Sequence, residues 1–187
     1  MNIFWTSDWH LNHLNIIKYC NRPFSNLEEM NSTIINRFNE RVNSDDMCFY
    51  LGDFIFKSGS NRGEGEPDKA MTFRNQLNCR QMIFIEGNHD AKGKNSLRTP
   101  IRKIIIRYGG KDICMVHSPD HIDWNYSFHI CGHVHEKWDF KEFQRNGKRI
   151  HCCNVSVERW KYYPITWDEI NQAYSSWLKG RKNETIN

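Results

Sequence analysis

M-I-F-I-E-G-N-H-D, residues 82–90, is the stretch that decides the fold of this chain. Its first part, Met82–Glu86, is a short apolar run of the kind that forms a buried β-strand. Its second part, Gly87–Asp90, supplies an amide, an imidazole and a carboxylate directly after that run. Because strands of one sheet can end at a common edge, the stretch predicts a strand that delivers polar ligands to such an edge.

The same arrangement occurs four more times along the chain, with metal-binding side chains at or just after an apolar run. The runs are Ile3–Thr6, Met47–Leu51, Ile113–Val116 and Phe128–Cys131, and the clusters are Asp8-Trp9-His10, Gly52-Asp53, His117 and Gly132-His133-Val134-His135. One such cluster arises easily by chance, whereas five at strand ends are specific. Together they predict a site for two divalent cations, with Asp53 placed to bridge them.

The segments between these clusters predict helices early in the chain and hairpins later. The predicted helices are Leu27–Val42, Asp68–Leu77 and Trp167–Leu178, the last ended by Gly180, with a loop over Lys57–Pro67. The predicted hairpins are Ile101–Arg107 with Asp112–Val116, and Lys137–Gln144 with Lys148–Val157. This order favours an α/β domain, residues 1–187, in which two mixed sheets pack together with helices outside.

Composition sets limits on the class of protein. The 187 residues suit one domain, and a net charge of +4 is too small to indicate nucleic acid by itself. The seven cysteines form no CxxC pair, and their odd number predicts reduced thiols in a cytoplasmic protein. The N-terminal residues do not resemble a signal peptide, and no apolar run is long enough to span a bilayer.

The order D-x-H, G-D, G-N-H-D, H, G-H-x-H resembles that of the calcineurin-like metallophosphoesterase superfamily, from Ile3 to about Val155. Tyr19–Phe24 and Leu51–Phe54 are similar to a compact bacterial and phage branch. The resemblance implies a four-layer αββα sandwich. It also implies two sets of metal ligands, with Asp53 in both. The first set is Asp8, His10 and His135, and the second is Asn88, His117 and His133.

Four more residues are candidates for catalysis or substrate binding. The resemblance implies that His89 donates a proton to the leaving oxygen or steadies the phosphoryl group, and Asp90 beside it is predicted to orient its imidazole. His13 follows His10 on the same loop and either contacts the phosphate or holds its own backbone. Arg22 either binds substrate or forms a surface ion pair.

The predicted function is hydrolysis of phosphate esters by a hydroxide that two metals activate. The mixed nitrogen and oxygen ligands suit Mn, Fe, Zn, Co or Ni better than Ca, and Mn²⁺ is the expected ion. The expected substrate is a phosphodiester in a nucleotide or short nucleic acid, with a phosphomonoester as the alternative. We expect no membrane association and no obligate protein partner. A different class remains open: an interaction module of the same fold that has lost catalysis.

Overall fold

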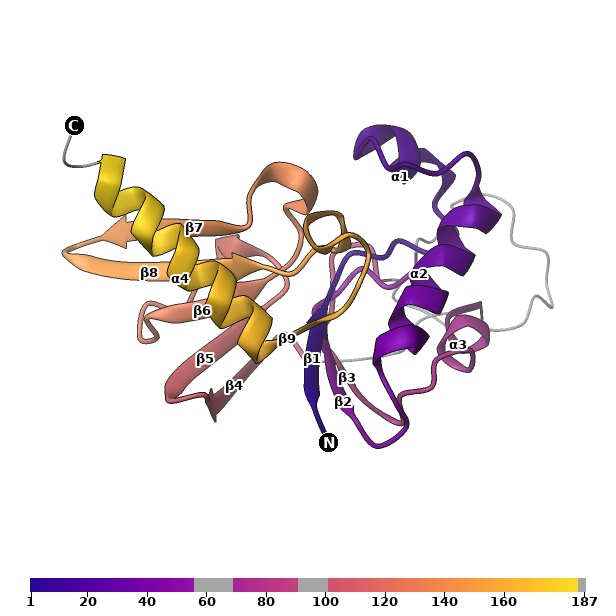
Figure 1. The fold of residues 1–187 in the computed structure, drawn as a ribbon, viewed down its shortest axis with the longest axis horizontal. Helices are drawn as coiled ribbons and strands as arrows, with labels where there is room; N and C mark the ends of the chain where they lie inside the picture. The colour runs from indigo at the N-terminus through magenta and orange to yellow at the C-terminus, as the bar shows by residue number, and fades with distance from the viewer. Residues whose placement is uncertain (56–68, 91–100, 185–187) are drawn as a thin grey trace.

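The first sheet has four strands and carries three of the predicted clusters at its edge. The structure is a computed structural model that describes residues 1–55, 69–90 and 101–184. The sheet order is β3-β2-β1-β9 (Figure 1), with bounds Gln81–Phe84, Met47–Tyr50, Ile3–Thr6 and Ile165–Thr166. β1, β2 and β3 are parallel, and β9 is antiparallel to β1. The residues that follow the three parallel strands therefore emerge at one edge.

The second sheet has five strands in the order β4-β5-β6-β8-β7. Their bounds, in that order, are Lys103–Tyr108, Lys111–Val116, Phe128–Cys131, Lys148–Asn154 and Phe140–Arg145. β5, β6 and β8 run parallel, and β4 and β7 pair antiparallel with β5 and β8. The ends of β5 and β6 thus bring His117 and the His133–His135 cluster to one edge of this sheet.

Two helices, α2 (Leu27–Arg41) and α3 (Lys69–Arg74), lie on the outer side of the first sheet, and α1 (Leu14–Tyr19) lies above them in the view of Figure 1. Asn26 caps α2 by accepting a hydrogen bond from the backbone N–H of Glu29 at 2.9 Å. The apolar stripe of α2 packs on alternate residues of β1 and β2: Met30, Ile34 and Phe38 share a core with Phe4, Cys48 and Tyr50. The apolar residues of the helix recur with the helical period of 3.6 and those of the strands with a period of 2, and both sets contribute to this core, as the sequence predicts.

The fourth helix, α4 (Trp167–Glu184), packs against the face of the second sheet that also contacts the first. Phe128 on that face lies 5.7 Å from the ring of Trp167 and 5.1 Å from that of Tyr174. On the same face, Met115 accepts a hydrogen bond from Trp5 Nε1 of the first sheet at 3.2 Å. The aromatic stripe of α4 therefore extends the core between the sheets.

The α/β class with two mixed sheets is confirmed, and the described residues show two departures from expectation. First, α4 shares the inner face of the second sheet, whereas a regular αββα sandwich would place it outside. Second, α4 continues past Gly180 to Glu184. The predicted loop Lys57–Pro67 lies wholly outside the described residues. Three short 3-10 helices complete the elements: η1 (Pro119–His121), η2 (His135–Lys137) and η3 (Val157–Trp160).

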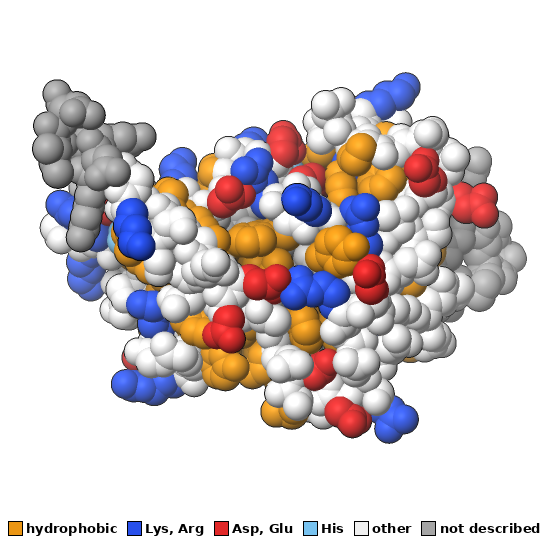
Figure 2. Space-filling model, in the orientation of Figure 1, with side chains coloured by type: hydrophobic (Ala, Val, Ile, Leu, Met, Phe, Trp, Pro, Cys, Tyr) orange, Lys and Arg blue, Asp and Glu red, His pale blue; other side chains and the backbone are white. Residues whose placement is uncertain are grey.

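On the face shown in Figure 2, acidic and basic side chains are interspersed, which agrees with the small net charge of +4. Within the described residues, no helix is both long and apolar enough to cross a membrane. All seven cysteines are free thiols, as predicted.

His129 gives the fold a testable pH dependence. Its side chain is fully buried, its Nε2 accepts a hydrogen bond from the N–H of Asp123 at 3.1 Å, and burial lowers its pKa to about 4. Because the unfolded chain takes up this proton near pH 6.5, acidification stabilises the unfolded state first. The shift corresponds to a loss of roughly 3 kcal/mol of unfolding free energy between about pH 6.5 and pH 4.

His129→Gln is the variant that isolates this contribution, because its amide still accepts the hydrogen bond but does not titrate. Urea unfolding of both proteins at about pH 7 and about pH 5 measures the difference. We expect a smaller loss of stability in the variant. Equal losses in the two proteins would show that another group carries the pH dependence.

Candidate metal centre

The backbone around the site is held in an unusual conformation. Five of the seven predicted ligands have positive φ angles: 59° at Asp8, 50° at His10, 60° at Asp53, 72° at His133 and 47° at His135. This region is unfavourable for residues with a Cβ, and such strain concentrates at functional sites. The surrounding contacts must therefore stabilise a loop geometry that aims these side chains.

The two carboxylate oxygens of Asp8 differ in their hydrogen bonding. Its Oδ2 accepts hydrogen bonds from Ser7 Oγ at 2.5 Å, Ser156 Oγ at 2.9 Å and the N–H of His133 at 2.9 Å. Its Oδ1 is buried and has no hydrogen-bond partner among the described residues. A buried carboxylate oxygen without a donor is costly, and a cation would compensate it.

Asp53 lies between the two predicted ligand sets. Its Oδ1 accepts a hydrogen bond from the N–H of His89 at 2.7 Å. Its Oδ2 has no hydrogen-bond partner in the described part of the chain and lies 3.4 Å from both His10 Nε2 and His117 Nε2. One carboxylate oxygen thus faces an imidazole from each set, which is the geometry that a bridging ligand requires.

The remaining ligands complete two compact groups. Asp8, His10 and His135 have ligand atoms within 4.8 Å of one another, and so do Asp53, His117 and His133. Asn88 joins the second group, because its Oδ1 lies 2.8 Å from His117 Nε2 and 2.9 Å from His133 Nδ1. The structure therefore brings all seven predicted ligands together, and this donor set of nitrogen and oxygen fits two divalent ions.

Neighbouring acceptors fix the orientation of two of the imidazoles. His117 Nδ1 is 2.7 Å from the carbonyl oxygen of Leu51, and His135 Nδ1 is 2.9 Å from Glu158 Oε1. With the proton on Nδ1, Nε2 of each ring is free to bind a metal. Second partners of this kind are typical of metal-binding histidines.

Two glycines allow the carboxylates to approach the backbone closely. A Cβ at Gly87 would lie 2.1 Å from Asp53 Oδ1, and a Cβ at Gly132 would lie 2.3 Å from Asp8 Oδ2. Any larger residue would displace the carboxylate at these positions.

Electrostatics also favour cations in the site. Burial opposes the charge on His117, but the nearby carboxylates of Asp53 and Asp8 raise its pKa to about 9. Burial likewise opposes the charge on His135, but contacts with Cys20 and Glu158 raise its pKa to about 11. Buried carboxylates thus stabilise positive charge here, and metal ions would compete with these protons.

The carboxylate of Asp90 contacts the backbone and not the imidazole that the sequence predicts. The predicted partner was His89. Instead, Asp90 Oδ2 accepts hydrogen bonds from the N–H groups of Asp53 at 2.9 Å and Gly87 at 2.7 Å, and its Oδ1 accepts one from Phe54 at 3.0 Å. Three backbone donors occupy the carboxylate, so Asp90 holds the turn that carries Asp53.

Arg22 is also placed differently, since it is neither in a surface ion pair nor open to substrate. Its exposure is 4%, and its guanidinium donates to the carbonyl oxygens of Asp8 at 2.7 Å and Trp9 at 2.8 Å. Its Nη2 also forms an ion pair with Glu158 at 2.5 Å. Because Glu158 contacts His135 as well, Arg22 connects the Asp8–His10 loop to the third ligand of the first set.

His13 and His89 both lie near the first ligand set. Their ring centroids are 5.4 Å and 5.2 Å from that of His10. His13 is buried, which lowers its pKa to about 4, whereas His89 is exposed. His89 is therefore the histidine of this pair that a substrate can reach directly.

The residues at and just after the end of β8 support the first ligand set, and they were not predicted from the sequence. Asn154 Nδ2 donates to the carbonyl oxygen of His135 at 2.7 Å, Ser156 contacts Asp8, and Glu158 contacts His135. Their signal is the alternation Asn154-Val155-Ser156-Val157-Glu158 at the end of a strand. This segment follows a strand, as the other polar clusters do, but it contains no histidine and so does not have the pattern of a metal-binding cluster.

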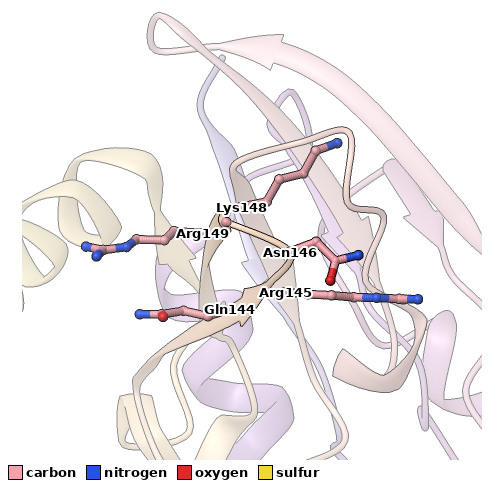
Figure 3. Close-up of a pocket in the computed structure, with 6 residues that line it drawn as sticks. Gln144, Arg145, Asn146, Lys148 and Arg149 are labelled. Carbon is pink, nitrogen blue, oxygen red and sulfur yellow. The ribbon is translucent and has the colours of Figure 1, made fainter.

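A pocket at the other end of the second sheet is separate from this site. Figure 3 shows it at the tip of the β7–β8 hairpin, lined by residues 144–149. β8 runs from this tip toward Asn154, which contacts the His135 loop, so the length of the strand separates the two places. Lys148 donates there to the carbonyl oxygen of Trp124 at 3.2 Å, and none of the predicted ligands lines the pocket.

The fold and the site together define an α/β protein with two mixed sheets and a candidate metal centre. The chain belongs to the same family as the uncharacterized protein MJ1445 of Methanocaldococcus jannaschii, to which it is 36% identical over 188 residues, 99% of this chain and 96% of that protein. No family model matches the chain.

The chain is similar to two solved structures. The protein of unknown function AQ665 from Aquifex aeolicus has a TM-score of 0.64 at 24% identity, covering 92% of this chain and 98% of that one. An archaeal phosphodiesterase has a TM-score of 0.42 at 18% identity, covering 82% of each chain, which is too low to assign an activity. The similarity to AQ665 shows the fold alone.

Proposed function

We propose that the protein is a metal-dependent phosphoesterase with two divalent ions at this centre, Mn²⁺ being the expected metal. The observation that carries the proposal is the position of Asp53 Oδ2, 3.4 Å from an imidazole nitrogen of each ligand set. When bound, such a pair of ions lowers the pKa of a coordinated water and clamps phosphoryl oxygens. Fe, Zn, Co and Ni are the alternative metals.

The residues of this chain then have distinct tasks. Asp8 and Asp53 supply negative charge that offsets part of the charge of the cations, which leaves a net positive centre for a phosphate. His89 lies next to His10 at the exposed side of the site and donates a proton to the leaving oxygen. His13 stays a candidate for contact with the phosphate, and Arg22 and Asp90 act as positioning residues.

The proposed substrate is a phosphodiester in a nucleotide or short nucleic acid. Asn88 and His89 are exposed at the centre, so an ester with a large leaving group can reach them. We further propose that residues 1–187 form one domain and that the protein is cytoplasmic with reduced thiols. We also propose that it belongs to the compact bacterial and phage branch of the superfamily. Hydrolysis rates for matched monoesters and diesters, with short oligonucleotides included, distinguish the two substrate classes.

Removal of metal is expected to abolish hydrolysis. The chelated protein should also unfold at lower temperature, because ions that bind only the folded state stabilise it, by about 2.7 kcal/mol at 100 times Kd. Addition of Mn²⁺ should restore both activity and melting temperature. Activity that persists in protein shown to be metal-free by elemental analysis would contradict the proposal. A protein that does not hold close to two metals per chain after reconstitution, and that hydrolyses no ester, would support the interaction-module alternative.

A further inference from the structure

A second group of metal-binding side chains overlaps the first ligand set and shares one histidine with it. It consists of Cys20, His135 and Glu158, which come from the end of α1, from η2 and from η3. Their ligand atoms lie within 4.8 Å of one another. Cys20 is partly exposed, whereas the other six cysteines are buried. An ion from solvent can therefore reach this thiol.

Glu158 provides an independent indication that the group binds a ligand. Its side chain is only 4% exposed, and its Oε1 accepts hydrogen bonds from Arg22 and His135. Its Oε2 is buried and has no hydrogen-bond partner among the residues that the structure describes. Leaving an ionised oxygen buried in this way is unfavourable, and a cation between Glu158 and Cys20 would compensate it.

We propose that Cys20, His135 and Glu158 form an additional, overlapping site for a thiophilic divalent cation, with Zn²⁺ as the expected ion. Sulfur, nitrogen and carboxylate oxygen are the donors that zinc combines in proteins, whereas Mg²⁺ and Mn²⁺ favour oxygen. On binding, the S–H bond of Cys20 breaks, its proton leaves to solvent, and the thiolate bonds to the ion. A water completes a four-coordinate site.

The site shares His135 with the first ligand set, and this makes it inhibitory. His135 Nδ1 already lies 2.9 Å from Glu158, so an ion beside Glu158 engages this nitrogen and removes its proton. One ring would then have to bind two cations as an imidazolate, which is unfavourable next to a second centre. Zinc at Cys20 is therefore expected to compete with the activating metal for His135. This consequence rests on the proposed function, but the existence of the site does not.

Cobalt spectroscopy tests the site directly. Co²⁺ added to chelated wild-type protein should give a near-ultraviolet thiolate-to-cobalt charge-transfer band. The band should be lost in Cys20→Ser and kept in Cys79→Ser, a matched control because the Cys79 thiol donates to the carbonyl of Asp46, away from the metal ligands. No band in the wild type at saturating Co²⁺, or a band that survives in Cys20→Ser, would overturn the proposal.

Thiol protection gives a second measurement that needs no variant. Zn²⁺ should slow alkylation of Cys20, located by mass spectrometry, by about 100-fold at 100 times Kd, while Mg²⁺ should not. Equal alkylation with and without zinc would also overturn the site. Loss of Mn²⁺-dependent hydrolysis with the cobalt band intact would instead contradict the proposed function and leave the thiolate site standing.

Discussion

Asp53→Asn is expected to abolish hydrolysis and to leave the protein unable to hold two metals. Its Oδ1 accepts the N–H of His89, and the asparagine carbonyl can keep that hydrogen bond, so the fold should survive. The amide NH₂ then takes the place of Oδ2, between His10 and His117. A donor group at this point cannot bind a cation. We expect a loss beyond the roughly 10–100-fold that follows removal of a residue that only supports a ligand.

Elemental analysis and kinetics on the same preparations measure this effect. His10→Ala and His117→Ala each remove a ligand from one set only. Each variant is therefore expected to bind the ion of the unaltered set with higher affinity than Asp53→Asn does. Asp112→Asn, at an exposed carboxylate of β5, is the control that should change neither quantity. If Asp53→Asn kept both metals and a near-normal rate, Asp53 would not be the bridge.

The clusters of candidate ligands could be predicted from the sequence, because each comes at or just after an apolar run, whereas their division into two sets came from the family resemblance. β1, β2 and β3 are parallel to one another, as are β5 and β6, so the ends of these strands lie at one edge of each sheet. The period-2 and period-3.6 patterns likewise predicted most of the elements. These are local signals, and local signals can be identified in a single sequence.

The supporting contacts could not be predicted, because each joins residues far apart in the chain. Ser156 reaches Asp8 across 148 positions, and Arg22 reaches Glu158 across 136. Arg22 was therefore predicted to bind substrate or to form a surface ion pair. Its burial beside Glu158 decides its role instead. Asp90 was similarly assigned to its sequence neighbour, whereas three backbone N–H groups determine its orientation.

The end of α4 illustrates how tertiary contacts override a local preference. Glycine inside a helix costs about 1 kcal/mol relative to alanine, so Gly180 predicted a helix end. Arg181 lies 4.8 Å from the ring of Trp177 and donates to Glu142 on β7 at 3.2 Å. These contacts hold the next turn against the second sheet, and the helix continues.

His89→Ala is expected to slow hydrolysis to an extent that depends on the leaving group. His89 is exposed beside His10, and its own backbone N–H is bonded to Asp53. Removing the imidazole leaves that backbone contact intact, so both metals should stay bound. A p-nitrophenolate leaves readily near neutral pH, whereas a ribose or alkyl alkoxide needs a proton. Proton transfer of this kind contributes roughly 10²–10⁴-fold.

The ratio of the rates on matched nucleoside and p-nitrophenyl esters therefore reports the role of His89 independently of the absolute activity. We expect the variant to lose roughly 10²-fold or more on the nucleoside ester and much less on the p-nitrophenyl ester. His121→Ala removes a different exposed histidine and should change neither rate. Equal losses on both esters would mean that His89 positions the phosphoryl group. Loss of a metal, measured on the same sample, would make it a support for the ligands, and the proton-donor assignment would fall.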